Sequence, residues 1–329
     1  MKGNEIAVPA SIANLGPGFD TLAVAVELYL RLHIAAVSPD DGDSLEFEFV
    51  DQKLEGENYI ERAFRFLADA SGKHFPSLHI QVRSEIPMRA GLGSSAAATV
   101  AGLKLFEKMT RPLSTSELLS AASGLEGHPD NVSAALLGGL TASCRLADGT
   151  VNALQSRWPE SIRFVVLTPE IRLKTSDSRS VLPEAIRRRD AVFNLQRVAM
   201  LLLSLQREDY QYLREALRDR WHQPYRDKLI PGLKEALALD HPDLLGVCLS
   251  GSGPSIVALA ERNFPKIEEL LAQSYGKTGI PFSVRTLAVH QQVAGRKSQV
   301  EGRQSKVASR KSGIGSRRSQ VAGRRSDVD

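Results

Sequence analysis

Apolar and polar positions alternate with two different periods in the first half of the chain, and the two periods predict a mixture of strands and helices. Every second residue from Val24 to Ile34 is apolar, and the same alternation recurs at 45–49 and 78–82, which predicts three strands. Apolar residues within 60–67 have helical spacing instead. The segment Ser114-Thr115-Ser116-Glu117 matches a capping box, so we expect a helix to begin there.

The second half of the chain carries a similar mixture. The stretches 140–146 and 150–154 flank Asp148-Gly149, which predicts a hairpin. Further predicted elements are a strand at 162–167, three or more helices between 183 and 239, strands at 244–249, 255–260 and 282–289, and a helix at 267–275. The pattern favours an α+β protein with a domain boundary near 155–160.

Length and composition limit the class of protein. A chain of 329 residues has room for two domains of ordinary size, and 42% hydrophobic residues is normal for a globular protein. The longest apolar runs, such as Val198–Leu205, are too short to span a bilayer, and the N-terminus has no apolar signal core. Cys144 and Cys248 both lie in apolar stretches, so we expect two buried, reduced thiols in a cytoplasmic protein; a disulfide would need an oxidising compartment.

The net charge of +4 is unevenly distributed along the chain. Residues 291–329 hold 10 basic and 3 acidic residues, a net of +7, which leaves −3 for residues 1–290. This basic tail repeats Val or Ile every seven residues, and one apolar residue in seven is too few for a coiled-coil seam. We therefore expect a disordered tail, with contact to nucleic acid or anionic lipid as the functional alternative.

The strongest chemical signal is a glycine-rich segment, residues 87–97, which we call the phosphate loop. It reads Pro87-Met88-Arg89-Ala90-Gly91-Leu92-Gly93-Ser94-Ser95-Ala96-Ala97 and leads from a predicted strand into a predicted helix. Glycines allow close approach of the backbone, and a helix N-terminus offers free N–H groups to an anion. The segment is not a Walker A loop, because no Lys-Ser/Thr pair follows the glycines. Taken alone, a glycine turn with an N-capping serine would explain it equally well.

Two further segments remove that ambiguity. Pro9-Ala10-Ser11-Ile12-Ala13-Asn14-Leu15-Gly16-Pro17-Gly18-Phe19-Asp20 stands near the N-terminus, and Leu249-Ser250-Gly251-Ser252-Gly253-Pro254-Ser255 lies between two predicted strands. In this order, the three segments resemble the signature motifs of the GHMP kinase superfamily. The first segment is most similar to that of the homoserine kinase family, and the resemblance covers about residues 4–290.

The resemblance implies a fold and an activity. The fold would be a two-domain α+β GHMP kinase fold: an S5 domain 2-like ATP-binding domain at 1–157, a ferredoxin-like domain at 158–290, and the basic tail at 291–329. The activity would be an ATP- and Mg²⁺-dependent transferase reaction on the hydroxyl of L-homoserine, in threonine biosynthesis. A cytoplasmic homodimer without membrane contact would be expected. The alternatives are a GHMP kinase for another small alcohol, and a non-catalytic binder of a ligand or nucleic acid that kept the fold.

The resemblance also implies roles for individual residues. The phosphate loop would hold ATP, and Glu126 with Ser95 would hold Mg²⁺, a cation that prefers oxygen ligands. His128 and Asn131 would lie beside the substrate hydroxyl. An amino-acid substrate needs partners for its carboxylate and its ammonium group, and Arg is suited to the carboxylate. The residues expected to bind substrate are Asn14, Asp20, His128, Asn131, Thr175, Arg179 and Arg226, with Arg179 and Arg226 on the carboxylate and Asn14 and Asp20 on the ammonium group.

Asp130 is the remaining candidate in the segment Glu126-Gly127-His128-Pro129-Asp130-Asn131. Other GHMP kinases use an Asp base in a comparable Asp-Asn pair. Homoserine kinases are thought to work without a dedicated base, and phosphoryl transfer tolerates this because positioning and charge neutralisation supply most of the acceleration. We therefore expect Asp130 to have a structural role.

Overall fold

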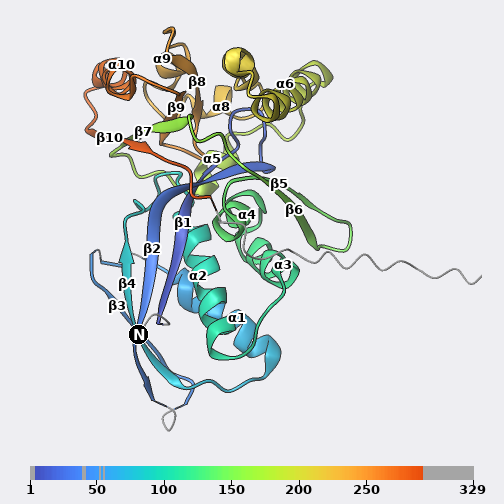
Figure 1. The fold of residues 1–329 in the computed structure, drawn as a ribbon, viewed down its shortest axis with the longest axis vertical. Helices are drawn as coiled ribbons and strands as arrows, with labels where there is room; N and C mark the ends of the chain where they lie inside the picture. Colours follow the sequence, from blue (N-terminus) through green and yellow to red (C-terminus); the bar gives the residue numbers. More distant parts are fainter. Residues whose placement is uncertain (1–3, 39–41, 52, 55, 292–329) are drawn as a thin grey trace, which may run out of the picture. The chain divides into compact units, whose positions relative to one another are not determined.

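Six strands of the N-terminal half form one mixed sheet in the computed structural model, which describes residues 4–38, 42–51, 53–54 and 56–291 (Figure 1). These strands are β1 (Glu5–Ala13), β2 (Leu22–Ser38), β3 (Leu45–Phe49), β4 (Ser77–Ser84), β5 (Leu140–Arg145) and β6 (Val151–Ser156). The order is β3-β4-β2-β5-β6, with β1 paired to β2; only β3 and β4 run parallel. The 17-residue strand β2 therefore connects all parts of this sheet.

Four helices pack together along this sheet: α1 (Tyr59–Ser71), α2 (Ser94–Met109), α3 (Thr115–Glu126) and α4 (Asp130–Leu137). Helix α2 is central because it contacts both β1 and β2 and also packs against α1, α3 and α4. Gly102 permits the close packing of α2 on α1, since a Cβ there would lie 2.1 Å from the carbonyl oxygen of Ile60. The apolar alternation of β2 faces the core that these helices complete.

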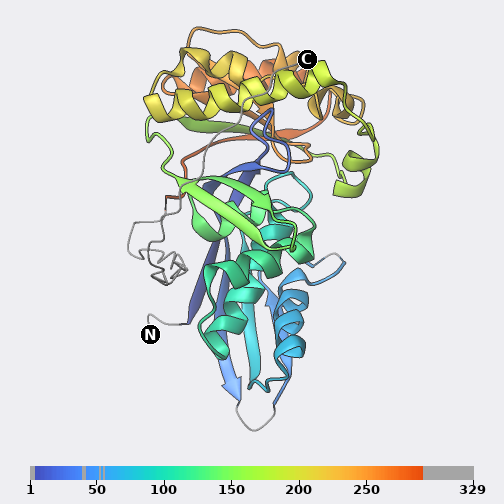
Figure 2. The same ribbon diagram turned by 90° about the vertical axis from the view of Figure 1, so that its right-hand side faces the viewer.

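The second half of the chain builds its own four-stranded antiparallel sheet. Its strands are β7 (Arg163–Pro169), β8 (Leu244–Leu249), β9 (Ile256–Ala260) and β10 (Phe282–Leu287), in the order β10-β7-β9-β8. The helices are α5 (Thr175–Ser180), α6 (Arg188–Arg207), the 3-10 helix η2 (Tyr210–Tyr212), α7 (Leu213–Ala216), α8 (Gln223–Arg226), α9 (Leu233–Leu237) and α10 (Phe264–Gly276). Figure 2 shows the yellow and orange helices of this half on one side of the sheet. Numbered from β7, the strand order is 4-1-3-2, as the ferredoxin-like prediction requires.

Most predicted elements are confirmed, including the hairpin β5–β6 and the capping box of Ser114 and Glu117. Strand β1 was not predicted, because residues 8–13 are all buried and the alternation is lost. The prediction that both thiols are buried is wrong for Cys144, which is exposed near the hairpin end of β5, whereas Cys248 is buried; both are free.

Two other features of the chain bear on the predictions. The predicted disordered tail lies outside the described residues, except for Gln291 at its start. Throughout the described part of the chain, no helix combines the length and apolar character needed to cross a membrane.

Candidate active site

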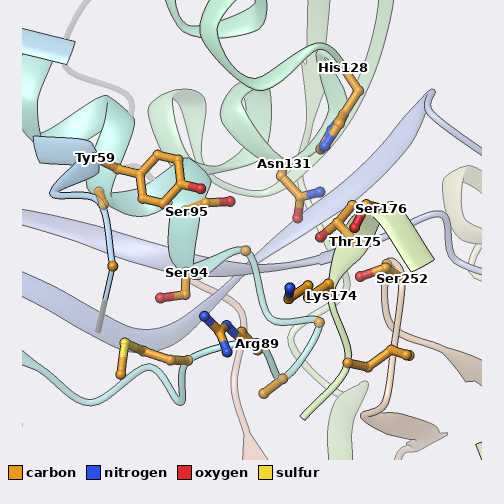
Figure 3. Close-up of a pocket in the computed structure, with 18 of the residues that line it drawn as sticks. Tyr59, Arg89, Ser94, Ser95, His128, Asn131, Lys174, Thr175, Ser176 and Ser252 are labelled. Atoms are coloured by element: carbon orange, nitrogen blue, oxygen red, sulfur yellow. The ribbon is translucent and has the colours of Figure 1, made fainter. Parts of the chain in front are cut away.

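One cavity of about 510 Å³ is lined by residues of both sheets' connecting segments. Figure 3 shows Arg89, Ser94 and Ser95 on one side of it and Thr175, Ser176 and Ser252 on the other, with Asn131 between them and His128 above Asn131. The N-terminal motif reaches the same cavity through Asn14, Phe19 and Asp20. The structure therefore brings together the segments that the sequence singled out.

The phosphate loop connects the end of β4 to the start of α2. Gly91 and Gly93 have φ angles of +77° and +69°, a region that side chains rarely adopt. Residues from Met88 to Ser95 line the cavity apart from Leu92. Leu92, Ala96 and Ala97 are buried in the core, and Pro87 does not line the cavity. The exposed part of the loop thus presents backbone and hydroxyl groups at the N-terminus of a 16-residue helix.

The three motif segments are in direct contact. The backbone N–H of Ser11 donates to the carbonyl oxygen of Leu92 (3.1 Å), and the N–H of Ser255 donates to that of Ala90 (3.1 Å). A Cβ on Gly91 would lie 2.5 Å from the carbonyl oxygen of Ser250, so only glycine allows this approach. The phosphate loop is consequently held from both sides by the other two segments.

Glu126 lies at the C-terminal end of α3 and faces α2. Its Oε2 accepts a hydrogen bond from the hydroxyl of Ser95 (2.7 Å), and its Oε1 accepts one from the hydroxyl of Thr99 (2.6 Å). Sequence reasoning paired Glu126 with Ser95 but missed Thr99, although Ser95 and Thr99 are four residues apart and so share a helix face. The group offers one carboxylate and two hydroxyl oxygens, the donor type that Mg²⁺ prefers.

The start of α4 holds a second polar group. Nδ1 of His128 donates to Oδ1 of Asp130 (2.7 Å), which also accepts from the backbone N–H of Asn131 (2.8 Å). Burial lowers the pKa of His128, but the hydrogen bond and charge of Asp130 outweigh it, so the net pKa is raised above the ordinary value. The amide oxygen of Asn131 accepts from the hydroxyl of Ser11 (2.8 Å), which links this group to the N-terminal motif.

One carboxylate and two guanidinium groups form what we call the ion-pair end of the cavity. They belong to Asp20, Arg179 and Arg226. Arg179 donates from Nη1 (3.0 Å) and Nη2 (2.7 Å) to the two carboxylate oxygens of Asp20. Burial lowers the pKa of Arg179, but Asp20 outweighs it and the net shift is upward. The family resemblance assigned Arg179 to the substrate carboxylate and Asp20 to its ammonium group. In the structure the two side chains bind each other.

Arg226 is almost entirely buried, yet it lines the cavity. Its Nε donates to the carbonyl oxygen of Ser178 (3.2 Å) and its Nη1 to that of Gly251 (2.8 Å). Burial, followed by the charge of Arg179, lowers the pKa of Arg226 to about 10, so it remains protonated at neutral pH. The carboxylates of Asp20, Asp219 and Asp130 oppose this shift, so the guanidinium lies among negative charges as well as beside a second cation.

The turn at residues 14–20 positions Asp20. Asn14, Leu15 and Asp20 all have positive φ angles, and the amide of Asn14 holds the turn by donating to the carbonyl oxygen of Gly251 (3.0 Å) and accepting from the N–H of Asp20 (3.1 Å). Asn14 therefore already has protein partners on both of its amide atoms. Phe19, which the sequence did not single out, lies with its ring centroid 5.5 Å from the guanidinium carbons of both Arg179 and Arg226.

Two further features of the cavity were not foreseen. Apolar side chains line the end near α1, among them Phe49, Leu54, Tyr59 and Val82. Side-chain oxygens and nitrogens of Asp20, His128 and Asp130 lie within 4.8 Å of one another, which is close enough for metal ligands. Asp20 is already paired with Arg179, and Asp130 with His128. These atoms are therefore less suited to a cation than the oxygens around Glu126.

Comparisons with known proteins agree with this geometry. The chain matches the family model for the GHMP kinases N terminal domain at residues 58–139 and the model for GHMP kinases C terminal at residues 201–276. It is 37% identical to a homoserine kinase of Solibacter usitatus over 278 residues, which is 83% of this chain and 90% of that protein.

Solved structures give the same result. The crystal structure of homoserine kinase from Cytophaga hutchinsonii superimposes with a TM-score of 0.75 at 27% identity, over 88% of this chain and 95% of that one. The mevalonate kinase of Methanococcus jannaschii superimposes with a TM-score of 0.65 at 16% identity, over 87% and 98%, and shows likeness of fold alone.

Proposed function

Because the chain belongs to the homoserine kinase family of the GHMP kinases, we propose that it transfers the γ-phosphoryl group of ATP to the side-chain hydroxyl of L-homoserine. The product would be O-phospho-L-homoserine, an intermediate of threonine biosynthesis. One observation carries the proposal: a phosphate-binding loop and an end with two arginines and one carboxylate open into the same cavity. A sugar or an isoprenoid precursor has no use for an ammonium-binding carboxylate beside paired arginines.

The phosphate loop holds the triphosphate in this proposal. The N-terminus of α2 presents unpaired N–H groups and the positive end of its dipole, and Ser94 and Ser95 add hydroxyl donors. Arg89 lies on the exposed part of the loop and lines the cavity, so its charge is available to phosphate oxygens. The apolar lining near Tyr59 offers the adenine ring a place to pack.

Mg²⁺ fits the oxygen atoms around Glu126. The carboxylate of Glu126 and the hydroxyl of Ser95 are 2.7 Å apart and beside the phosphate loop, and we assign the ion to these two residues. When bound, the ion would neutralise charge on the phosphates. Thr99 keeps the carboxylate oriented by donating to its other oxygen.

The ion-pair end selects a zwitterion. The side chains of Asp20 and Arg179 are 33% and 38% exposed, so the ion pair is accessible from the cavity and can exchange its partners for those of a substrate. The substrate ammonium group binds Asp20, and the carboxylate binds Arg179 together with Arg226. The exchange replaces one ion pair by two.

His128 and Asn131 orient the hydroxyl that attacks the γ-phosphorus. Both residues line the cavity that also contains the phosphate loop and the ion-pair end, which fits this role. Asp130 is occupied by His128 and by the N–H of Asn131, which supports a structural role rather than that of a base. The hydroxyl proton passes to a phosphate oxygen or to solvent as the new P–O bond forms and the bond to ADP breaks.

The remaining parts of the proposal concern organisation. We divide the chain into an ATP-binding domain at 1–157 and a second domain at 158–290, and we expect a cytoplasmic homodimer. Light scattering of the purified protein tests the dimer.

A substrate panel tests the activity. ATP consumption is measured with L-homoserine, L-threonine, mevalonate and galactose in parallel, and ³¹P NMR identifies the product. We expect turnover with L-homoserine and a phosphomonoester signal that matches O-phospho-L-homoserine. Turnover with mevalonate or galactose alone would assign the chain to another small alcohol, and no turnover with any of them would favour a non-catalytic binder.

A further inference from the structure

His222 lies behind the ion-pair end of the cavity and does not line it. The ring is fully buried at the start of α8 and contacts two different segments. Nε2 is 2.7 Å from the carbonyl oxygen of Gly16, in the turn that carries Asp20, and Nδ1 is 2.9 Å from Nη1 of Arg226. One imidazole therefore connects the turn at residues 14–20 to an arginine of the ion-pair end.

The two contacts fix the protonation state of the ring. A carbonyl oxygen can only accept and an arginine N–H can only donate, so Nε2 carries the proton and Nδ1 has a free lone pair. An imidazolium would direct a second N–H at the guanidinium. Burial and the charge of Arg226 also lower the pKa of His222, against the opposing charges of Asp219 and Asp20. The ring is neutral in a site surrounded by charges.

Arg226 has three protein acceptors, and this lone pair is the one that belongs to a side chain. Its other protein acceptors are two backbone carbonyls, those of Ser178 and Gly251, on Nε and Nη1. Within the described residues, Nη2 makes no hydrogen bond to the protein. Since Arg226 lines the cavity, Nη2 is the atom left for a substrate carboxylate. The guanidinium is thus held by one edge and free on the other.

Two neighbours keep the imidazole in place. The carboxylate of Asp219 accepts from the backbone N–H groups of His222 (2.9 Å) and Gln223 (2.7 Å), which fixes the start of α8. The ring of Phe19 lies 5.4 Å from that of His222, centroid to centroid. Phe19 lines the cavity and His222 does not, so the Phe19 ring separates the imidazole from a bound ligand.

We propose that His222 is a positioning residue that sets the affinity for the amino-acid substrate by holding Arg226 through its Nδ1 lone pair. The inference rests on the proposed function, because it concerns the same substrate carboxylate. It assigns to His222 no contact with the substrate and no part in proton transfer.

Two substitutions separate the two contacts of the ring. His222→Asn keeps an acceptor at the position of Nδ1 and loses the donor to Gly16, whereas His222→Gln keeps a donor near Nε2 and loses that acceptor. Loss of a hydrogen bond to a charged group corresponds to roughly a tenfold change in affinity or more. We expect His222→Gln to raise the KM for L-homoserine about tenfold, with the KM for ATP within about twofold, and His222→Asn to stay within about threefold of wild type.

A double-mutant cycle with Arg226→Ala tests whether His222 acts through Arg226. We expect His222→Gln to raise the homoserine KM no further once Arg226 is absent. The matched control is Gln223→Met. Gln223 lies on the same short helix as Arg226, and its side-chain oxygen accepts from the buried N–H of Leu249 in β8 (2.7 Å). The substitution should lower the unfolding temperature and leave the homoserine KM unchanged.

Three results would overturn the inference. They are equal KM values for the Asn and Gln variants, a parallel rise in the KM for ATP, and an additive effect in the Arg226→Ala background. If His222→Gln does not fold, a tenfold rise in His222→Asn still contradicts it. A wild-type protein that does not use L-homoserine would refute the proposed function instead; ¹⁵N NMR of the histidine rings then tests the inference by itself, since a protonated ring or an Nδ1–H tautomer at residue 222 rules it out.

Discussion

The phosphate loop and the ion-pair end of the cavity are built in opposite ways. The phosphate loop is one continuous segment between β4 and α2, so its binding groups come from neighbouring glycines and from the start of a helix. At the ion-pair end, by contrast, Asp20 meets Arg179 across 159 residues of sequence, and Asn14 meets Gly251 across 237. The groups that bind phosphate therefore come from one local segment, although distant segments hold that segment in place. The groups that recognise the amino acid themselves come from distant segments.

The largest expected effect is at Glu126, beside the phosphate loop. Glu126→Gln keeps the size of the side chain and removes the charge that would hold Mg²⁺, so we expect turnover to fall by about 100-fold or more with the fold intact. Steady-state kinetics measure the turnover, and circular dichroism shows whether the fold is intact. The control is Glu117→Gln at the other end of α3, where the backbone N–H of Ser114 lowers the pKa of Glu117 to about 2. This variant should lose a little stability and no activity; near-normal turnover of Glu126→Gln would remove Glu126 from the site.

Substitutions at the ion-pair end should weaken the binding of homoserine much more than the binding of ATP. Arg179→Ala or Arg226→Ala removes a charge-assisted hydrogen bond worth about 1.5–3 kcal/mol, which is roughly ten- to a hundredfold in homoserine affinity. The KM for ATP should change less than about threefold. Arg220→Ala is the control, since Arg220 pairs with Asp190 at 3.4 Å and does not line the cavity. Normal homoserine binding by both variants would show that the ion-pair end is not the substrate site.

His128 and Asp130 both line the cavity and are joined by a hydrogen bond. This interaction should appear in the pH dependence of stability. The pKa of His128 is raised in the folded protein, so its ion pair with Asp130 stabilises the fold fully below about pH 6.5 and is lost as the pH rises through the raised value. The difference in unfolding temperature between wild type and Asp130→Asn should therefore shrink from pH 5.5 to pH 8.5. A difference that is constant over this range would mean that Asp130 acts only as an acceptor for Asn131.

The smallest effect is expected from removing residues 292–329. Every residue assigned to the site lies at or before Ser252, and the described residues that contact one another end at Gln291. Both KM values and the unfolding temperature should stay within error of the full chain. A truncated protein that loses activity would place part of the site in the tail.

The sequence predicts the local features well and the distant ones poorly. The phosphate loop and the capping box follow from short patterns, whereas the family resemblance implied the pairing of Glu126 with Ser95; the structure has all three in place. Strand β1 escapes prediction because residues 8–13 are buried without alternation. The bond between Asp20 and Arg179 could not be predicted, because nothing in either local pattern encodes a partner 159 residues away.

His222 illustrates the same limit. A histidine beside a proline-containing helical turn is unremarkable in the sequence, and its meaning arises only when Gly16 and Arg226 are placed on either side of it. Thr99, in contrast, was within reach of sequence analysis, because it is one helical turn from Ser95.

The most direct test of this account is a comparison of three alcohols at saturating MgATP. L-Homoserine carries both charged groups, 4-hydroxybutanoate lacks the ammonium group, and 3-aminopropan-1-ol lacks the carboxylate. If the ion-pair end recognises a zwitterion, kcat/KM should fall by roughly tenfold or more for each analogue, while the KM for ATP stays the same. Equal use of L-homoserine and either analogue would contradict the assignment of Asp20, Arg179 and Arg226 to the substrate.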